Sequence, residues 1–551
     1  MDPISTTGPA PTDEVDRMMV EAVARMRTAF KIPAFRRGQE QVIRSILAGR
    51  DVLAVMPTGS GKSLTYQLTS QVLPGTTLVV SPLLALIRDQ TEKLRSLGIA
   101  VERIDSSLTG KERTAALGRL AEGKTKLALV TPESAVSASF RNAMAGARVS
   151  LFAVDEAHCV SQWGHDFRPA YLGLREVAES LGRPRLLALT ATATPRVRED
   201  ILAQLGMRDP EQVVLSFDRP NLQFQVVTCG SEEDKLRILF RKLLRRLHRP
   251  GIIYSATVKS VEDLAFLSKK LRIPAEYYHG RMKKADRDEK QAGFMKPGRR
   301  VVMIATNAFG LGVDKPDIRY VLHFHVPGSL EAYVQEAGRA GRDGKPSRCI
   351  LLWSPDDVAI QEYFQEGNYP SGKQVRQVEE ALRAWTDTDR GVGIRALATS
   401  SNVGEKRTRV VLDFLDENGW AEEDDDGKWR AAGVVPEGML KLAVKWFDEK
   451  RIEDKRRLDA LVGYAETKIC RVRYMLDYFG EPGPDRCGRC DNCLEAAKLD
   501  AKMRALAGEE EEPAAEPGRR KRRRRGRRRG RGRGEAGAAA PGAAAGGAAQ
   551  A

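Results

Sequence analysis

The stretch DVLAVMPTGSGKSLTYQ, residues 51–67, decides the class of fold. It opens with an apolar run typical of a buried strand, turns through two glycines and ends in a segment with helical periodicity. Glycines in such a turn let backbone N–H groups wrap around phosphate, and the N-terminus of the next helix adds positive potential. The order therefore predicts a phosphate-binding loop on a parallel α/β sheet, although the first glycine of the strict pattern is missing.

The loop supplies the candidate contacts to a bound nucleotide. Lys62 is expected to reach the β and γ phosphates, and the Ser63 hydroxyl is expected to bind Mg²⁺. The alternative is a glycine turn with an exposed lysine, but the flanking strand and helix favour the phosphate loop. The residues predicted to bind the nucleotide here are Thr58, Gly59, Ser60, Gly61, Lys62 and Ser63.

A second motif, LFAVDEAHC at 151–159, places two carboxylates after an apolar strand. Asp155 is expected to bind Mg²⁺ through water, and Glu156 to orient or deprotonate the attacking water. Alone, such a pair is usually solvated surface. Together with the glycine loop earlier in the same lobe, it predicts hydrolysis of a nucleoside triphosphate.

Short β-rich runs alternate with amphipathic segments from residue 30 to 208, and the pattern restarts after SFDRPN to fill residues 209–360. Strands that alternate with helices predict parallel sheets, so we expect an α/β protein with two lobes in series. The first lobe would bind ATP, and a ligand in the cleft between the lobes could drive their closure.

The second lobe carries QEAGRAGRDG at 335–344, which contains Arg339 and Arg342. Arginines on a different lobe can complete a hydrolytic site only when the cleft closes, so we predict that both stabilise the transition state. The alternative for at least one of them is contact with a nucleic-acid backbone, because arginine is a common phosphate ligand.

The remaining segments differ in character from the two lobes. Helical segments and a hairpin with an Asp426-Gly427 turn predict a winged-helix-like segment at 372–435, with a small helical spacer as the alternative. We expect a helical lead-in at 1–29 and a helical module at 436–500. The charged and Ala/Gly/Pro-rich residues 508–551 have too little apolar surface to order themselves, so we expect a disordered tail.

The tail also dominates the net charge of +16, because residues 519–533 contain 12 basic residues and no acidic one. The electrostatic case for a polyanionic partner therefore rests mainly on the tail. No run of about 18 apolar residues occurs, so we expect no membrane partner and a soluble, cytoplasmic protein, associated with the nucleoid if the source is bacterial.

Four of the seven cysteines fall close together, as Cys470, Cys487, Cys490 and Cys493, with two of the intervals only two residues long. Four thiolates are enough for a closed tetrahedral site, which predicts structural Zn²⁺. An iron-sulfur cluster uses the same ligand type and remains the alternative.

The order and content of these motifs resemble the RecQ family of superfamily-two DNA helicases. The matching stretches are FRRGQ at 35–39, MPTGSGKS at 56–63, SPLLALIRDQ at 81–90, TPE at 131–133, DEAHCVSQWGHDFRP at 155–169, LTATAT at 189–194, SFDRPNL at 216–222, YHGRM at 278–282, ATNAFGLGVDKPDIR at 305–319 and YVQEAGRAGRDG at 333–344. The resemblance implies two RecA-like lobes, a zinc module, ATP with Mg²⁺, and 3′-to-5′ unwinding of DNA in repair or recombination.

The resemblance also implies roles for two further groups of residues. FRRGQ resembles the adenine-reading element, so Gln39 would read the adenine edge beside Arg36. The loop after the carboxylates would sense DNA, and its aromatic faces suit base stacking while its basic groups suit phosphate. The predicted DNA contacts are Trp163, His165, Phe167 and Arg168, with buried core aromatics as the alternative.

Two departures from the family limit what the resemblance carries over. Ile32 stands where many members have an aromatic residue to stack on adenine, and the segment between GRAGRDG and Cys470 is longer than usual. The expected partners are single-stranded and partly duplex DNA, with RNA contact through the tail left open and protein partners unknown. An RNA-directed remodeller and an annealing scaffold with residual ATPase remain as alternative functions.

Overall fold

The computed structural model describes residues 12–507, apart from residues 165, 245, 246, 248, 249, 311, 312, 368, 387–390, 425 and 426. Several sequence predictions fall outside this range: the tail at 508–551, the first residues of the lead-in, His165 and Asp426 of the hairpin turn. The rest of the lead-in forms one helix, α1 (Thr12–Thr28). Within the described residues, no helix has the length and apolar character needed to cross a membrane.

A seven-stranded sheet forms the centre of the first lobe, and all its paired strands are parallel. Its strands, in spatial order, are β3 (Val101–Ile104), β4 (Leu127–Val130), β2 (Thr76–Val80), β5 (Val149–Val154), β6 (Arg185–Thr190), β1 (Val52–Val55) and β7 (Glu211–Val214). β7 lies beyond the expected boundary at residue 208, yet it pairs with β1. The first lobe therefore extends to Val214.

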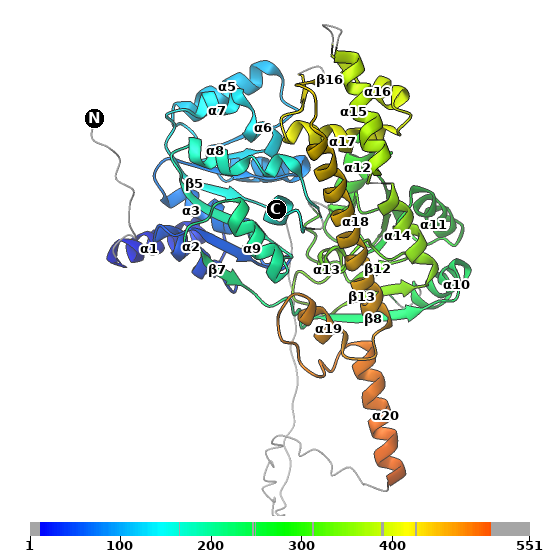
Figure 1. Ribbon diagram of the computed structural model, residues 1–551. Helices are drawn as coiled ribbons and strands as arrows, with labels where there is room; N and C mark the ends of the chain where they lie inside the picture. Colours follow the sequence, from blue (N-terminus) through cyan, green and yellow to red (C-terminus); the bar gives the residue numbers. More distant parts are fainter. Residues whose placement is uncertain are drawn as a thin grey trace, which may run out of the picture. The chain divides into compact units, whose positions relative to one another are not determined.

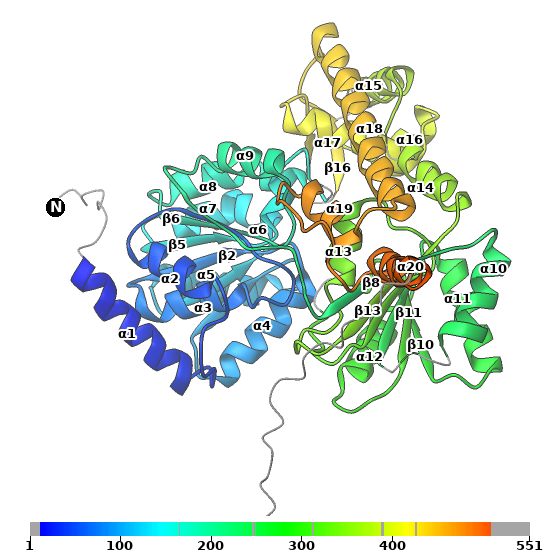
Figure 2. The same cartoon turned by 90° about the horizontal axis from the view of Figure 1, so that it is seen from below.

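Helices cover both faces of this sheet, which is why its central strands are apolar throughout. One face is covered by α1, α2 (Gln39–Leu47), α3 (Ser63–Val72) and α4 (Leu84–Ser96). The other face is covered by α5 (Gly110–Ala121), α6 (Pro132–Val136), α7 (Ala138–Met144), α8 (Leu174–Ser180) and α9 (Pro195–Gln204), and short 3₁₀ turns lie at Ala157–Val160 and Pro169–Tyr171. Figure 2 shows α8 and α9 on one side of the sheet and α3 and α4 on the other.

The second lobe repeats this plan with six parallel strands. In spatial order they are β10 (Ala275–Tyr278), β11 (Val302–Ala305), β9 (Gly251–Tyr254), β12 (Tyr320–His323), β13 (Ser347–Trp353) and β8 (Leu222–Thr228). The helices are α10 (Glu232–Arg237), a π-helical turn (Ile238–Leu243), α11 (Val258–Lys270), α12 (Lys284–Met295), α13 (Leu330–Ala337) and α14 (Asp356–Glu366). The expected fold class of two parallel-sheet lobes is confirmed.

Between the second lobe and the cysteine module lies an inserted segment with a core of its own. Its elements are α15 (Gly372–Thr386), β14 (Val392–Gly393), α16 (Ile394–Ser400), α17 (Glu405–Glu417), β15 (Ala421–Glu423) and β16 (Lys428–Ala431). The three strands form an antiparallel sheet in the order β14-β16-β15. Three helices and three strands make up the segment for which the sequence predicts a winged-helix-like fold, and Trp429 fills its core.

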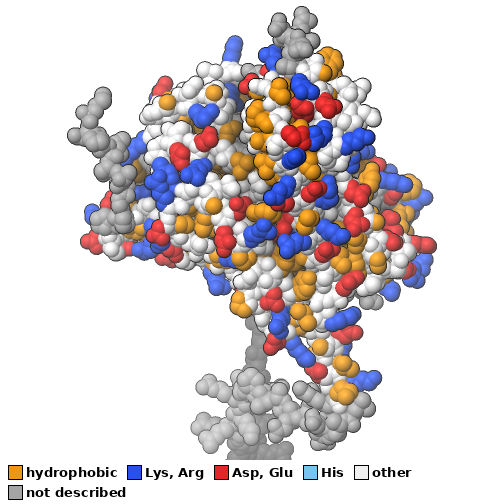
Figure 3. Space-filling view, in the orientation of Figure 1, with side chains coloured by type: hydrophobic (Ala, Val, Ile, Leu, Met, Phe, Trp, Pro, Cys, Tyr) orange, Lys and Arg blue, Asp and Glu red, His pale blue; other side chains and the backbone are white. Residues whose placement is uncertain are grey.

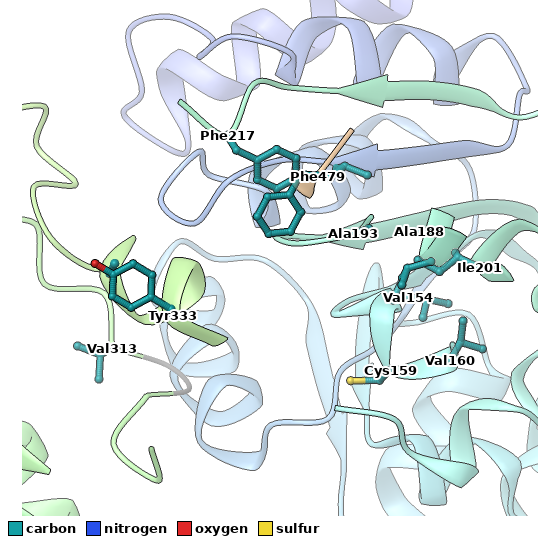
Figure 4. Close-up of a cluster of buried hydrophobic side chains, with 14 of the residues drawn as sticks. Val154, Cys159, Val160, Ala188, Ala193, Ile201, Phe217, Val313, Tyr333 and Phe479 are labelled. Atoms are coloured by element: carbon teal, nitrogen blue, oxygen red, sulfur yellow. The ribbon is translucent and has the colours of Figure 1, made fainter. Parts of the chain in front are cut away.

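The cysteine module consists of the long helix α18 (Glu437–Glu466), α19 (Arg471–Tyr478) and the start of α20 (Asp491–Ala507) (Figure 1). It packs on the segment that joins the two lobes. Phe217 of that segment stacks on Phe479, as Figure 4 shows. The ring centroids are 4.2 Å apart and the ring planes differ by 13°. One continuous hydrophobic core therefore includes residues from both lobes and from the module.

Candidate active site

The glycine loop lies between β1 and α3, as the sequence predicts, and its shape is held from the side of α2. Gly59 and Gly61 have positive φ angles of 86° and 80°, which L side chains rarely adopt. The Gln39 side-chain amide donates to the carbonyls of Ser60 at 3.0 Å and Gly61 at 2.9 Å. The Arg36 guanidinium donates to the Gly59 carbonyl at 2.5 Å.

These contacts show how the predicted adenine-reading residues are used in this structure. Gln39 is only 2% exposed, and its side-chain oxygen accepts from the Arg36 backbone N–H at 2.8 Å. Both N–H groups of its amide are engaged by the loop carbonyls. Reading an adenine edge as well would require Gln39 to exchange one of these bonds.

Lys62 and Ser63 lie at the start of α3, where the helix N-terminus favours an anion. Lys62 Nζ donates to the Met56 carbonyl at 3.2 Å, so the ammonium lies inside the curve of the loop. Burial lowers the pKa of Lys62, while the nearby carboxylates of Glu156 and Asp155 oppose this shift. Ser63 Oγ accepts from the Gln90 amide at 3.3 Å.

The two predicted carboxylates lie at the end of β5, next to the loop. Asp155 is 5% exposed, and burial together with the charge of Glu156 raises its pKa to about 7. Glu156 has φ 49°, a left-handed conformation that is costly for a residue with a side chain. Its Oε2 lies 3.4 Å from His158 Nδ1, and that nitrogen also contacts the Thr190 hydroxyl at 2.9 Å.

Of the two predicted arginines, Arg342 is the one that reaches the phosphate loop. A Cβ added to Gly59 would lie 3.1 Å from the Arg342 Cγ, so the two lobes touch at this point. The Arg342 guanidinium pairs with Asp314 at 2.6 Å, and burial lowers its pKa. Its side chain is 12% exposed.

Arg339 lies instead within its own lobe. It is 4% exposed and contacts the hydroxyl of Tyr254. A Cβ added to Gly310 would come within 2.9 Å of its Nη2. The structure therefore brings Arg342 to the phosphate loop, near Lys62 and the carboxylates. Arg339 is instead buried within the second lobe, next to Tyr254 and Gly310.

A residue without a role in the sequence prediction, Arg219, joins the two lobes. It follows β7 in the SFDRPN motif and donates to the Thr58 carbonyl of the phosphate loop at 3.0 Å. The same guanidinium donates to carbonyls in the second lobe: Gly338 at 3.4 Å, Ala340 at 3.3 Å and Gly341 at 3.0 Å. The motif was visible in the sequence, but the bridge between two distant loops was not.

The segment 161–168 after the carboxylates is called the aromatic loop below. Trp163 and Phe167 are half-buried, and the guanidinium carbon of Arg196 lies 3.5 Å from the centroid of the Trp163 ring. Arg168 pairs with Asp166 at 3.4 Å and donates to the Pro82 carbonyl at 3.4 Å. The loop thus presents basic and aromatic groups together, while His165 is outside the described residues.

The four predicted cysteine ligands converge. The Sγ atoms of Cys470, Cys487, Cys490 and Cys493 all lie within 4.8 Å of one another. The Cys487 and Cys493 sulfurs are 3.9 Å apart, close to the ~3.8 Å edge of a tetrahedron with Zn–S bonds of ~2.3 Å. The donor set and its size fit Zn²⁺.

Three models of known protein families match separate parts of the chain. Residues 36–201 match the model described as DEAD/DEAH box helicase, and residues 234–344 match the helicase conserved C-terminal domain. Residues 441–494 match the model described as RecQ zinc-binding.

Two curated relatives cover most of the chain. The "ATP-dependent DNA helicase RecQ" of Bacillus subtilis (strain 168) is 35% identical over 480 residues, which are 87% of this chain and 68% of that protein. The "Probable ATP-dependent DNA helicase RecS" of the same organism is 35% identical over 470 residues, 84% of this chain and 90% of that protein. This chain belongs to the RecQ family of DNA helicases. The resemblance drawn from the motifs is confirmed.

Among solved structures, the RecQ-family chain is similar in fold to Dbp5 of S. cerevisiae bound to RNA and ADP BeF3. The TM-score is 0.51 at 22% identity, covering 64% of this chain and 93% of that one. The two helicase regions imply ATP with Mg²⁺, and the zinc-binding region with its four converging cysteines implies Zn²⁺.

Proposed function

We propose that this RecQ-family, ATP-dependent DNA helicase couples ATP hydrolysis between its lobes to 3′-to-5′ movement along single-stranded DNA. Duplex separation would follow from that movement, in the repair and recombination processes typical of the family. The proposal is supported by contact between two parts of the ATP site: the phosphate loop of the first lobe and the arginine-bearing loop of the second lobe. Each part is called a half-site below. Arg342 of the second lobe lies against Gly59 of the phosphate loop, and Arg219 links both.

The first lobe provides the nucleotide site and the hydrolytic carboxylates. Backbone N–H groups from Thr58 to Gly61 bind the phosphates, and Lys62 contacts the β and γ phosphates. Ser63 and, through water, Asp155 would hold Mg²⁺, which would supply positive charge to neutralise the phosphates. Glu156 lies next to these groups and accepts the proton of the attacking water.

The second lobe provides positive charge for the transition state. Arg342 needs only a small displacement from Asp314 to reach a γ phosphate held by the loop, because its side chain already contacts Gly59. Arg339 would have to turn away from Tyr254 and reach the site only on further closure. Closure of the two lobes would then be coupled to ATP hydrolysis, and this coupling allows a helicase to move along DNA.

Recognition of ATP and DNA is assigned to separate elements. Arg36 and Gln39 lie beside the loop, where they would meet the adenine of a bound nucleotide. Trp163 and Phe167 stack on bases of the single strand, and Arg168 with His165 contacts phosphate. The aromatic loop directly follows the carboxylates along the chain, so DNA contact there can alter the position of Glu156.

The rate of ATP hydrolysis tests this proposal, when measured without nucleic acid, with single-stranded DNA and with RNA. We expect strong stimulation by DNA and little by RNA. We also expect Trp163→Ala and Phe167→Ala to retain the unstimulated rate and to lose the stimulation. Stronger stimulation by RNA would favour the RNA-directed remodeller, and full stimulation of both variants would rule out the loop as the sensor.

The arginine-rich residues 519–533 support an additional contact with nucleic acid. Twelve basic residues without an acidic one bind phosphate without reading sequence. This tail would therefore hold DNA, or RNA, near the motor.

A further inference from the structure

The aromatic loop is held by one face of the long helix α18. Trp446, Lys450 and Arg457 are spaced four and seven residues apart, which places them along one side of a helix. Two of them are side chains that also bind phosphate in many proteins, yet here all three are engaged by the loop. α18 is thus the element that fixes the loop in this structure.

Three hydrogen bonds make this contact. The Trp446 indole Nε1 donates to the Gln162 side-chain oxygen at 3.0 Å. Lys450 Nζ donates to the Gln162 backbone carbonyl, and the Arg457 guanidinium donates to the Trp163 backbone carbonyl. Two successive carbonyls of the loop are therefore bound by cations of α18.

Cations also cover the rings that would stack on bases. Lys450 Nζ lies 4.6 Å from the centroid of Phe167 and 6.0 Å from that of Trp163. Burial lowers the pKa of Lys450 to about 8, so the ammonium remains charged for the most part at neutral pH. Arg196 covers Trp163 in the same way, and it pairs with Glu453 of α18 at 3.5 Å.

An open space lies beside this contact. A cavity of about 350 Å³ is lined by Phe167 of the loop, Phe414 of the inserted segment and Trp446 of α18. The Phe167 and Trp446 rings meet edge to face, with centroids 6.4 Å apart. Trp163 packs against the main hydrophobic core, so the hydrogen bonds from α18 add to this packing in fixing the position of the loop.

α18 is anchored at both ends. Its first half packs into the core of the inserted segment through Leu440, Ala443 and Phe447. Its last turns pack on the second lobe, where Tyr464 and Tyr333 of α13 have ring centroids 5.1 Å apart. α13 leads into the loop that carries Arg339 and Arg342, so one rigid helix contacts both the aromatic loop and the arginine-bearing lobe.

We propose that Trp446, Lys450 and Arg457 are positioning residues that hold the aromatic loop in a docked state, and that single-stranded DNA must displace this contact to bind the loop. This inference rests on the proposed role of the loop as the DNA sensor. If only the undocked fraction binds DNA, weakening the contact raises the apparent affinity for DNA. A residue that binds DNA directly would have the opposite effect when it is removed.

The test measures ATP hydrolysis by the full chain against the concentration of a single-stranded oligodeoxythymidine. Trp446→Phe keeps an aromatic ring in the core and removes the indole N–H, and Lys450→Met keeps the length of the side chain and removes the cation. We expect each variant to need about fivefold less DNA for half-maximal rate, the effect of losing one hydrogen bond, with the saturated rate unchanged. The matched control Trp420→Phe alters a tryptophan of the inserted segment, away from the contact between the loop and α18, and should behave as the parent.

The result that would overturn the proposal is an unchanged or increased DNA requirement in Trp446→Phe and Lys450→Met. An increase would mean that α18 binds DNA directly. The Trp163→Ala variant separates this failure from failure of the proposed function: if its stimulation by DNA is lost while the α18 variants behave as the parent, the loop is the sensor and only the docking is wrong.

Discussion

The two halves of the ATP site differ in how they are assembled. On the first lobe, Lys62 and Ser63 are placed by one turn at the end of β1, and Asp155 and Glu156 by the end of the nearby β5. On the second lobe, Arg342 reaches the site only because the lobe as a whole lies against the phosphate loop.

The first-lobe half of the ATP site is therefore fixed, whereas the second-lobe half can be regulated. A half-site made within one sheet is present whether or not DNA is bound, since it depends on strands that are buried on both faces. A half-site supplied by another lobe depends on every contact that sets the position of that lobe. Arg219, the cysteine module and α18 are such contacts. Figure 3 shows Lys and Arg side chains interspersed with Asp and Glu on one face of the molecule.

The largest effect is expected from variants of the first half-site. Lys62→Ala and Glu156→Gln should each lower the rate of hydrolysis by about 10³-fold or more, since one loses phosphate contact and the other the base. Glu156→Gln should still bind ATP, whereas Lys62→Ala should bind it weakly. A nucleotide-binding assay in which both variants fail equally would contradict the role of Glu156.

Removal of zinc is the next largest perturbation. Metal-binding energy is folding energy in small thiolate sites, so a chelator should unfold the cysteine module and release Phe479 from Phe217. Elemental analysis should give about one zinc per chain. Iron in place of zinc, with a brown protein, would establish the cluster alternative.

The variant Arg219→Ala removes the hydrogen bonds that link the two half-sites. We expect about a tenfold lower rate of hydrolysis at saturating DNA, because several buried carbonyls lose their donor and the lobes lose a link, while ATP affinity changes little. Arg237→Ala, at an exposed arginine of the second lobe, is the matched control. Equal rates for the two variants would show that this bridge does not align the site.

The smallest effect concerns the tail, which lies outside the described residues. Deleting residues 509–551 should weaken DNA binding a few-fold at low salt and flatten the dependence of log affinity on log salt, since fewer counterions are released. The saturated rate of hydrolysis should be retained. If affinity and salt slope both stay as in the parent, the tail makes no contact with DNA.

The sequence predicted the half-site that depends on local order, and it missed the contacts that depend on distant pairs. The phosphate loop, the carboxylates and the four cysteines each lie in a short motif whose spacing carries its chemistry. The bond between Trp446 and Gln162 joins residues 284 positions apart, and that from Arg219 to Thr58 joins residues 161 apart. No periodicity or spacing encodes such pairs, because they arise only when separate elements pack.

The sequence also placed the end of the first lobe too early, at residue 208, because β7 is hard to recognise without its packing partners. β7 has the pattern EQVV, with only Val213 buried, so it lacks the apolar run that marks the central strands. It lies at the edge of the sheet, where one face and one edge can be polar. The helices and the hairpin of the inserted segment were predictable because they bury regular apolar positions such as Val411 and Leu415.

The most direct test of the central claim is hydrolysis by Arg342→Ala at saturating single-stranded DNA, measured beside its affinity for ATP. We predict a rate about 10² to 10³-fold below that of the parent, with ATP affinity within a few-fold, because the arginine acts on the transition state across the cleft. Arg339→Ala, whose side chain faces Tyr254, should lose less. Near-parental hydrolysis by Arg342→Ala would contradict the claim that the second lobe completes the site.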